Sequence, residues 1–269
     1  MPESRLWLSG TDGRCLLDSM ETRRNAIVEL INEHGTVSFS QIKEVFSHVS
    51  EMTLRTDLKA LDEAKRIVRV HGGAKSVQVV VGTDDYLSKR AVRSIPEKQR
   101  IAEKAISLLR PDTTVFVDSG STTTLLARQF PDQSNLIYTT GLSCATEFSG
   151  LSRPAVMLPG GRLNRFSQSV YGISAVRELE RVNFSQAFLG VTSYSPDTGF
   201  TCGSNEEAIL KQTAIRQSEQ SIVLMDSSKF GMISTFRICE LSEIDVVVSD
   251  GNLPESFLDL CRRHQVTVL

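Results

Sequence analysis

The sequence predicts an α/β fold class, in which an N-terminal winged helix-turn-helix unit is followed by a mostly parallel α/β domain. Three observations predict it. Apolar residues at helical spacing mark three short helices in the first quarter of the chain, and a hairpin signal follows them. Strand and helix patterns then alternate to the end of the chain, which is typical of a parallel sheet with helices on both faces. Between one such strand and its helix lies Asp118-Ser-Gly-Ser-Thr-Thr-Thr124, a run of small hydroxyl residues that is typical of an anion site.

Length and composition favour a cytoplasmic protein. The chain has 269 residues, a net charge of −2 and no apolar run near the roughly 18 residues of a membrane span. Its five cysteines are odd in number and show no Cys-x-x-Cys spacing, which argues against a disulfide framework or a zinc site. We therefore expect a reducing compartment, no membrane partner, no metal and no cofactor. Residues 1–19 are expected to be a leader without fixed structure, and the start codon is left open between Met1 and Met20.

The first two helices are short. The first is predicted over 21–34, with Gly35 as its C-cap. The second is expected to begin at Ser38 or Ser40, which can cap it, and to run to about Phe46. The apolar side chains expected to face the core from these helices are Ile27, Leu30, Ile31, Ile42, Val45 and Phe46.

The third predicted helix follows Ser50, which is placed to cap it. Leu54, Leu58 and Leu61 repeat at i, i+4 and i+7 and give this helix a core face. In a winged helix-turn-helix unit the third helix enters the major groove, where its exposed side chains reach base edges and phosphates. Arg55, on the face opposite the leucines, is therefore the strongest candidate for a contact with DNA.

A hairpin completes this unit. Strand patterns over 65–70 and 74–81 meet at a turn rich in glycine. The whole unit is predicted over residues 20–81, with the helix-turn-helix at about 37–60. The residues predicted to contact DNA, from the third helix and the wing, are Ser50, Met52, Thr53, Arg55, Thr56, Lys59, Arg66, Arg69, His71, Gly72 and Gly73.

The charge of the N-terminal unit is balanced, because residues 1–75 contain 11 basic and 11 acidic side chains. Its positive charge is concentrated in the third helix and the wing. A neutral unit predicts weak non-specific affinity, so we expect tight binding to a double-stranded DNA operator to need a homo-oligomer, either a dimer or a tetramer. A helical module of this size could instead bind another protein, and that alternative stays open.

Both halves of this unit resemble a known family. Thr53-Leu-Arg-Thr-Asp-Leu58, followed by Arg69 and His71-Gly-Gly-Ala74, resembles the DNA-binding domain of DeoR-type (DeoR/GlpR) bacterial transcriptional regulators. In that family a Thr-Ile-Arg-Arg-Asp-Leu helix precedes an Arg-x-His-Gly-Gly-Ala wing. Thr56 stands where the family usually has a second Arg, which removes one phosphate or base contact.

The rest of the chain is predicted as a linker over 82–96, where periodicity is lost and charge rises, and an α/β domain over 97–269. The first helix of this domain is expected over 97–109, and further helical patterns lie at 125–129, 206–218 and 254–264. The strand patterns lie at 115–117, 136–139, 155–158, 186–190, 221–225, 244–248 and 265–269.

Polar residues follow several of these strands. Ligands of parallel sheets bind at the carboxyl ends of the strands, so we expect an anionic effector beside the hydroxyl-rich segment. A lysine there would neutralise the anion, and a carboxylate would accept hydrogen bonds from sugar hydroxyls. The effector-binding residues predicted on these grounds are Asp118, Ser119, Gly120, Ser121, Thr122, Thr123, Thr140, Gly160, Gly161, Glu206, Lys211 and Lys229.

These segments also resemble the same family. The motifs that resemble its C-terminal sensor domain are Asp118-Ser-Gly-Ser-Thr-Thr123, Gly160-Gly161, Phe188-Leu-Gly190, Glu206-Glu-Ala208 with Lys211, and Asp226-Ser-Ser-Lys-Phe-Gly231. The resemblance implies a fold similar to ribose-5-phosphate isomerase-like enzymes, and a phosphorylated sugar or related metabolite as effector. It implies a repressor of carbohydrate-metabolism genes. Thr140 stands where relatives usually have Asn.

An enzyme is the alternative, namely a sugar-phosphate isomerase with an appended DNA-binding domain. Isomerisation needs a base beside the sugar carbon and stabilisation of the enediolate. Asp118 and Glu206 are the available carboxylates, and the four histidines lie outside the sensor loops. We therefore favour a regulator without catalytic residues.

Overall fold

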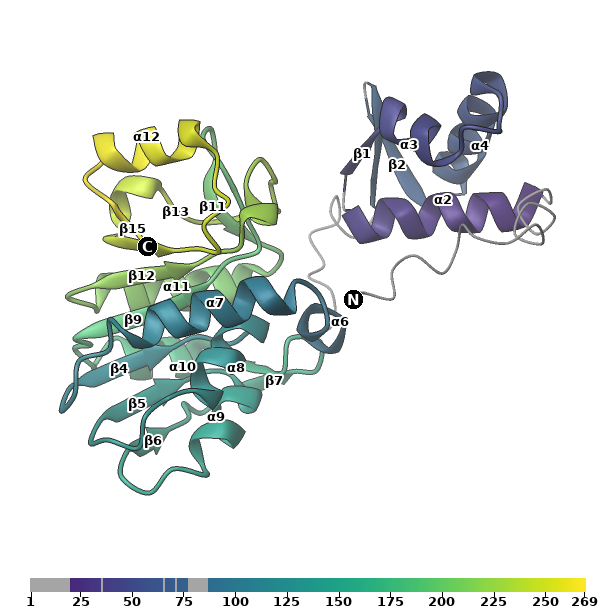
Figure 1. Cartoon of the computed structure of the whole chain (residues 1–269). Coiled ribbons are helices and arrows are strands. Elements are labelled where there is room, and N and C mark those ends of the chain that lie inside the picture. Colours follow the sequence, from purple (N-terminus) through teal and green to yellow (C-terminus); the bar gives the residue numbers. More distant parts are fainter. Residues whose placement is uncertain (1–19, 35, 65, 71, 77–86) are drawn as a thin grey trace. The chain divides into compact units, whose positions relative to one another are not determined.

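The computed structural model describes residues 20–34, 36–64, 66–70, 72–76 and 87–269. The chain divides into two compact units, residues 1–81 and 82–269, which are considered separately below (Figure 1). The predicted leader (1–19), His71 and the end of the second wing strand (77–81) lie outside the described residues, as does the start of the predicted linker. No described helix has the length and apolar character of a membrane span.

The N-terminal unit contains the predicted helices and hairpin. Its elements are α2 (Met20–His34), β1 (Thr36–Ser38), α3 (Phe39–Val45), α4 (Glu51–Glu63), β2 (Ile67–Val70) and β3 (Gly73–Ser76). The strands form an antiparallel sheet in the order β1-β3-β2. The sequence does not predict β1, because three residues are too few to show a period and its partner, β3, lies far along the chain.

Helix caps explain where two of these helices begin. The hydroxyl of Ser38 accepts the N–H of Gln41, whose side chain accepts the N–H of Ser38 in return, which is a capping box. Ser38, rather than Ser40, is therefore the cap of α3. The hydroxyl of Ser50 accepts the N–H of Thr53 and caps α4, as predicted.

The core of the N-terminal unit follows the predicted apolar pattern with one exception. The buried side chains from its three helices include Ile27, Val28, Ile31, Ile42, Phe46, Leu54, Leu58 and Leu61. Val45, predicted to face inward, is exposed. The reason is the shortness of α3, which ends at Val45, so that only Ile42 and Phe46 turn towards the core.

The second unit is built on a parallel sheet. Its strands are β4 (Thr114–Val117), β5 (Leu136–Thr139), β6 (Ala155–Met157), β9 (Gln186–Gly190), β12 (Ser221–Leu224), β14 (Val246–Val248) and β15 (Thr267–Val268). They lie in the order β15-β14-β12-β9-β4-β5-β6, and every neighbouring pair is parallel. All seven predicted strands are confirmed, with ends that differ by at most two residues.

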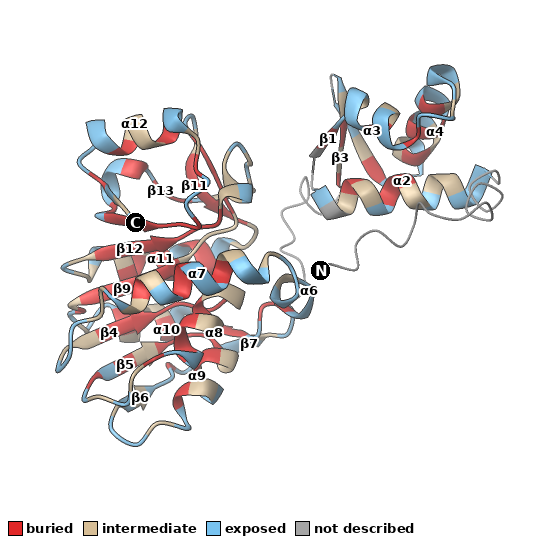
Figure 2. Cartoon of the chain, in the orientation of Figure 1, coloured by how far each residue is buried: buried red, intermediate tan, exposed pale blue. Residues whose placement is uncertain are grey.

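Helices cover both faces of this sheet (Figure 1). One face packs on α7 (Ile95–Ile106), α8 (Ser121–Arg128) and α9 (Leu142–Phe148), and the other on α10 (Ile173–Leu179), α11 (Asn205–Arg216) and α12 (Glu255–Arg263). Successive residues of a strand point to opposite faces, so Val115 and Val117 join the first layer and Phe116 joins the second. The central strands are accordingly buried along most of their length (Figure 2).

Short antiparallel strands lie outside the parallel sheet. The sequence does not predict them. They are β7 (Arg162–Asn164), β8 (Ser169–Tyr171), β10 (Ser193–Ser195), β11 (Gly199–Cys202) and β13 (Phe236–Cys239). β7 pairs with β8, and β11 pairs with both β10 and β13. Strands of three or four residues are too short to show a clear alternation of apolar and polar side chains. The pairing of β11 with β13 joins segments far apart in the sequence and forms only in the folded chain.

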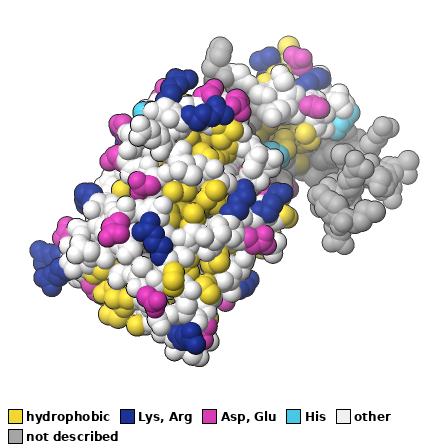
Figure 3. Space-filling view, turned by 60° about the vertical axis from the view of Figure 1, so that its left-hand side comes forward, with side chains coloured by type: hydrophobic (Ala, Val, Ile, Leu, Met, Phe, Trp, Pro, Cys, Tyr) yellow, Lys and Arg dark blue, Asp and Glu magenta, His cyan; other side chains and the backbone are white. Residues whose placement is uncertain are grey.

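The segment predicted as a linker contains a short helix, α6 (Leu87–Ala91). The N–H of Leu87 donates to the carbonyl of Phe166, between β7 and β8, at 2.8 Å. The following helix α7 begins at Ile95, with Pro96 in its first turn, and ends at Ile106 rather than at Leu109. On the face of the unit shown in Figure 3, charges of both signs alternate with apolar patches, as the net charge of −2 suggests.

Candidate functional site

The carboxyl edge of the parallel sheet contains a topological switch point. β4 and β9 are neighbours, and the strands that follow β4 in the chain extend away from it on one side, whereas those that follow β9 extend on the other. The loops after such a pair separate and leave a crevice, which is where ligands of open α/β sheets bind. Asp118 follows β4 and Gly190 ends β9, so both lie at this switch point.

Asp118 and Lys211 form a buried ion pair at the switch point. The Lys211 ammonium contacts the Asp118 carboxylate and donates to the carbonyl oxygen of Gly190 at 2.9 Å. The N–H of Gly190 donates to Oδ2 of Asp118 at 3.0 Å. Burial lowers the pKa of Lys211, but the negative charges of Asp118 and Glu207 outweigh it, and the net pKa is raised. Lys211 therefore stays protonated inside the protein, and the pair ties α11 to the ends of β4 and β9.

Two adjacent carboxylates lie at the start of α11, the predicted effector contact Glu206 and its neighbour Glu207. Glu206 is exposed and accepts a hydrogen bond from the hydroxyl of Ser204 at 3.0 Å. Glu207 is buried and accepts one from the hydroxyl of Ser169 at 3.3 Å. The i, i+4 spacing of Glu207 and Lys211 places both on one face of the helix, and this signal in the sequence could have identified Glu207.

The N-terminus of α8 is open to an anion. The helix begins at Ser121, four residues before the predicted helical pattern, so half of the predicted loop is its first turn. Gly120, with φ of 148°, is the N-cap, and no side chain caps the first N–H groups. These groups have no acceptor within the helix and lie at the positive end of its dipole. They can therefore bind a phosphate.

The hydroxyls around this turn fall into two groups. Ser121 and Thr122 are half-buried, and neither hydroxyl has a hydrogen-bond partner within the described residues. Thr123 is fully buried, and its hydroxyl donates to the carbonyl of Gly120 at 3.0 Å. The hydroxyl of Thr124 also donates to that carbonyl, at 2.7 Å. Ser121 and Thr122 are thus free to donate to a ligand, whereas Thr123 and Thr124 hold the turn in shape.

A group of cations lies at the same edge of the sheet. The ammonium of Lys98, near the start of α7, is buried and donates to the carbonyls of Arg90 and Arg93 at 2.5 and 2.6 Å. Burial and the charges of Lys229, Arg90 and Arg93 lower the pKa of Lys98 to about 8, although Asp226 opposes the shift.

Among the described residues, the carboxylate of Asp226 raises the pKa of Lys98, against three cations that lower it. Oδ1 of Asp226 already accepts from the N–H of Ser228 at 3.2 Å. The Nε of Arg90 is buried and lacks a hydrogen-bond partner among the described residues. Lys98 therefore lies among more positive than negative charge, and one of these positive charges is Lys229, which the sequence predicts as an effector contact. Asp226 belongs to the motif that the sequence analysis singles out around Lys229, but Lys98 and Arg90 are not predicted, because Lys98 comes within electrostatic reach of Lys229 only on folding.

The remaining predicted residues are placed as follows. Ser119 and Thr140 are buried after β4 and β5, and the carbonyl of Thr140 accepts the N–H of Val170 at 2.8 Å. The N–H of Gly160 donates to Glu178 on α10 at 3.3 Å. A Cβ on Gly161 would lie 2.5 Å from the carbonyl oxygen of Tyr171, so the hairpin of β7 and β8 leaves room only for glycine. The contacts of this glycine pair are with α10 and β8.

The predicted DNA-reading residues of α4 share one exposed face. Met52, Arg55, Thr56 and Lys59 are exposed, opposite the buried Leu54, Leu58 and Leu61. The Arg55 guanidinium lies 4.2 Å from the centre of the Phe39 ring and 3.8 Å from the Glu51 carboxylate. The hydroxyl of Thr53 is hydrogen-bonded to that of Ser50 at 2.8 Å, and both residues lie at the start of the helix.

The wing is placed by close backbone contacts. Gly72 has φ of 78°, a left-handed conformation that favours glycine. A Cβ on Gly73 would lie 2.3 Å from the carbonyl oxygen of Val37, so Gly73 lets β3 pack against β1. The Arg66 guanidinium donates to Asn25 of α2 at 2.8 Å, and Arg69 is exposed on β2. Within the described residues, no group of His, Cys, Asp or Glu side chains has the make-up of a metal site.

Two family models match the chain, one for each unit. Residues 23–80 match the DeoR-like helix-turn-helix domain, and residues 93–251 match the DeoR C terminal sensor domain. The second match alone covers more than half of the 269 residues.

Similar proteins match over nearly their whole length. The chain is 29% identical to the putative aga operon transcriptional repressor of Escherichia coli O157:H7, over 97% of this chain and 98% of that protein. It is 30% identical to the HTH-type transcriptional repressor GlcR of Bacillus subtilis, over 93% of this chain and 95% of that protein. Among solved structures, a ribose 5-phosphate isomerase A from Methanocaldococcus jannaschii is similar to 49% of this chain and 53% of its own, with 16% identity and a TM-score of 0.37.

Proposed function

The chain belongs to the DeoR family of DNA-binding transcriptional regulators, and we propose that it is a repressor of carbohydrate-metabolism genes whose affinity for DNA is controlled by a phosphorylated sugar. DNA binding is assigned to residues 20–81 and effector sensing to the domain that follows a linker over about 82–96. The observation that supports this most is the open N-terminus of α8 at the topological switch point. The names of the aga operon repressor and of GlcR support repression and sugar-related genes.

The α8 turn is proposed to bind the phosphate. The uncapped N–H groups of the first turn and the free hydroxyls of Ser121 and Thr122 supply donors, and the helix dipole favours negative charge. Lys229 and Lys98 add positive charge at the same edge of the sheet. Lys211 is proposed to act differently from our first expectation. Because it is paired with Asp118, it positions that carboxylate instead of neutralising the ligand.

The sugar is proposed to lie beside the Asp118–Lys211 pair. Asp118, Glu207 and the hydroxyl of Ser169 are the polar groups that could exchange hydrogen bonds with sugar hydroxyls. Glu206, on the exposed side of the same helical turn, stays a predicted contact at the rim of the site.

Effector control requires the ligand to bind two states of the protein with different affinity, because a ligand that binds both equally does not shift the equilibrium between them. The turn between α6 and α7 is a suitable place for that difference. Lys98 holds this turn through the carbonyls of Arg90 and Arg93, and Lys98 also lies beside Lys229. An anion near these two lysines would compete for the ammonium of Lys98 and loosen the turn that leads from the DNA-binding unit.

On the DNA side, α4 is proposed to enter the major groove with Arg55 as its principal contact. Arg55 would have to leave the Phe39 ring and Glu51, which exposed side chains do readily. One helix per chain contacts little DNA, so we propose a homo-oligomer, a dimer or a tetramer, that binds two half-sites. A protein with these partners would act in the cytoplasm.

The effector proposal is tested by measuring the thermal shift of the full chain with a panel of phosphorylated sugars and their unphosphorylated counterparts. We expect stabilisation only by phosphorylated compounds. Changing both Ser121 and Thr122 to Ala should raise the Kd of the best compound about tenfold, or roughly 1.4 kcal/mol. Thr146→Ala, which removes an exposed hydroxyl on α9, is the matched control. Stabilisation by none of the phosphorylated sugars, or turnover of one of them, would overturn the proposal.

The DNA proposal is tested with a duplex selected from a random library by the full chain. Arg55→Ala should lower affinity for that duplex about tenfold to a hundredfold and leave the thermal shift by the effector intact. Arg263→Ala, an exposed arginine at the end of α12, should change neither. Unchanged affinity in Arg55→Ala would mean that α4 does not read the DNA in the proposed way.

A further inference from the structure

One face of the parallel sheet is left without a helix at the β6 end. Leu136 pairs with Ala155, and Tyr138 pairs with Met157, so these four side chains lie on the same face of β5 and β6. Leu136, Ala155 and Met157 are exposed there. The other face of the same strands is covered, because Ile137 is fully buried and Val156 packs against the core under α9.

The exposed face is apolar. The two strands read Leu-Ile-Tyr-Thr and Ala-Val-Met, the composition of parallel strands that are buried on both faces. Leu158, just after β6, and Ile173, at the start of α10, are exposed as well. An apolar area of this kind on a folded domain is typical of an interaction site.

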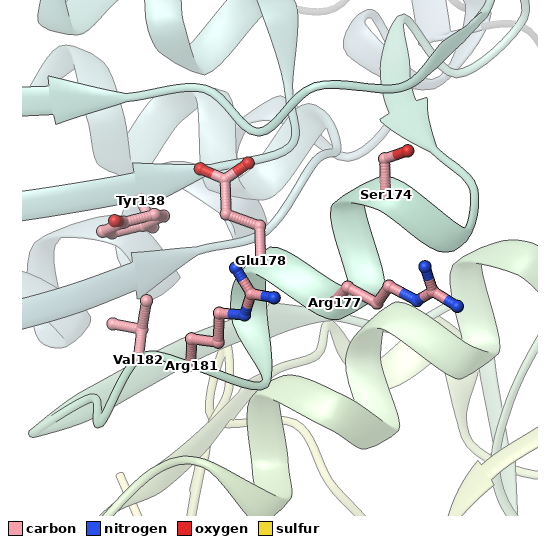
Figure 4. A pocket seen from close by; sticks show the side chains of 6 residues that line it. All are labelled: Tyr138, Ser174, Arg177, Glu178, Arg181 and Val182. Atoms are coloured by element: carbon pink, nitrogen blue, oxygen red, sulfur yellow. The ribbon is translucent and has the colours of Figure 1, made fainter.

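A pocket of about 560 Å³ lies between this face and α10 (Figure 4). Tyr138 lies on the strand side of the pocket, across from Glu178 and Arg181 in the close-up. The side chains that line it are Tyr138, Ser174, Arg177, Glu178, Arg181 and Val182. The ring of Tyr138 packs edge-on against Phe184 at 5.6 Å, which holds it in place as a wall of the pocket.

The rim of the face has charges of both signs. Arg177 and Arg181 are exposed one turn apart, and the exposed Glu180 lies between them in the sequence. Within the part of the chain that the structure describes, no ion pair joins any of these three side chains to another residue. These charges of both signs let the arginines of one copy meet the glutamate of a rotated second copy, as a two-fold interface allows.

The free edge of β6 does not suit pairing with another strand. β6 has three residues, and Pro154 and Pro159 lie next to its ends, where they cannot donate to a ladder. A partner is therefore expected to pack on the face of the sheet and not to extend it.

We propose that a second copy of this chain packs on the face formed by Leu136, Tyr138, Ala155 and Met157, with the Arg177 and Arg181 rim around it, as a two-fold dimer interface of the sensor unit. Side chains of the second copy fill the pocket beside α10. The inference rests on the proposed homo-oligomer and adds the surface that forms it.

Sedimentation velocity of the full chain over a range of concentrations tests this interface. Met157→Glu places a charge at the centre of the face, and it should raise the dimer dissociation constant about tenfold or more. Leu269→Glu is the matched control, because Leu269 is 39% exposed against 40% for Met157 and lies beyond β15 at the opposite end of the sheet. The control should dimerise like the parent chain.

A second variant, Arg177→Glu, tests the charged rim and should weaken the dimer by a smaller factor, about threefold, that shrinks at high salt. Circular dichroism confirms that each variant is folded. A parent chain that is monomeric at all concentrations overturns both the interface and the proposed homo-oligomer. A parent dimer that Met157→Glu leaves intact overturns only this surface, and the DNA and effector proposals stand.

Discussion

Both units of the chain contain a buried aspartate that is paired with basic side chains, but the two ion pairs lie in different surroundings. In the DNA-binding unit, Asp57 on α4 accepts hydrogen bonds from Arg23 and Arg24 on α2 at 2.6 and 2.8 Å. In the sensor unit, Asp118 at the end of β4 is paired with Lys211 on α11. The first pair fastens two helices, and the second lies inside the candidate effector site.

The difference lies in the access of the cations to water. The side chains of Arg23 and Arg24 are 13% and 22% exposed, whereas that of Lys211 is 5% exposed. A partly exposed cation can return to water when its partner is lost, but a buried one cannot. The sensor unit therefore holds this ion pair away from water, where its two groups interact strongly.

The largest expected effect comes from Lys211→Met, which keeps the length of the side chain and leaves Asp118 buried without a partner. We expect the free energy of unfolding to fall by about 3–5 kcal/mol, measured by urea unfolding followed with circular dichroism. The double variant Asp118→Asn with Lys211→Met removes both charges and should recover much of this loss. If Lys211→Met costs less than about 1 kcal/mol, Asp118 is not held as a buried charge.

Asp57→Ala should have a smaller effect, a loss of about 2 kcal/mol, because Arg23 and Arg24 can still reach water. The same unfolding measurement applies. Asp62→Ala, which removes a less buried acceptor on the same helix, is a suitable control. A larger loss for Asp57→Ala than for Lys211→Met would reverse the comparison between the two units.

The helix N-termini of the two units offer a third contrast. The start of α4 is closed by the hydroxyl of Ser50, whereas the start of α8 has no side-chain cap. Ser50→Ala should therefore lower the stability of the DNA-binding unit by about 1 kcal/mol. Ser40→Ala, an exposed serine that does not cap α3, should change it little. Equal effects of the two substitutions in thermal unfolding would argue against the cap.

The smallest effect is a dependence on pH that belongs to the sensor unit. The pKa of Lys98 is lowered from its usual value of 10.5 to about 8 in the folded chain. The unfolded chain therefore binds more protons than the folded one between these values, and stability rises with pH from about 8 upward. We expect a gain on the order of 1 kcal/mol between pH 8 and 9.

The comparison of parent chain and Lys98→Met isolates this dependence. The groups that face Lys98 are Lys229, Asp226, Arg90 and Arg93, and all four remain in the variant. The parent should gain stability relative to Lys98→Met as the pH rises through 8 to 9. A constant difference over that range would show that Lys98 does not lose its proton there. A phosphorylated ligand bound nearby should raise the pKa of Lys98 and suppress the gain.

Much of the fold could be predicted from the sequence, because local patterns determine it. The seven parallel strands and the three helices of the DNA-binding unit follow from runs of apolar residues, caps and glycine turns. The exposed face of α4 follows from helical periodicity alone, so Arg55 and Lys59 were placed correctly on its surface. The antiparallel strands β7, β8, β10, β11 and β13 were missed, because they are too short to show a period.

Part of the candidate effector site could be read from the sequence. The segment from Asp118 and the cation Lys211 belong to recognisable motifs, and both lie at the carboxyl edge of the sheet. Of the adjacent Glu206 and Glu207, the structure buries Glu207, which shares a helix face with Lys211. Lys98 was missed, because nothing near it in the sequence shows that it comes within electrostatic reach of Lys229 on folding.

The sequence by itself therefore determined the class of the two units, the order of their elements and the face of α4 that meets solvent, since these depend on residues a few positions apart. Only the tertiary structure decided that Lys211 forms an ion pair with Asp118, 93 positions away. It also brings Lys98 within electrostatic reach of Lys229. It also decided that one sheet face stays uncovered at β6. Charge pairing and burial depend on contacts between segments that are far apart in the sequence. Those contacts form only when the whole sheet packs with its helices.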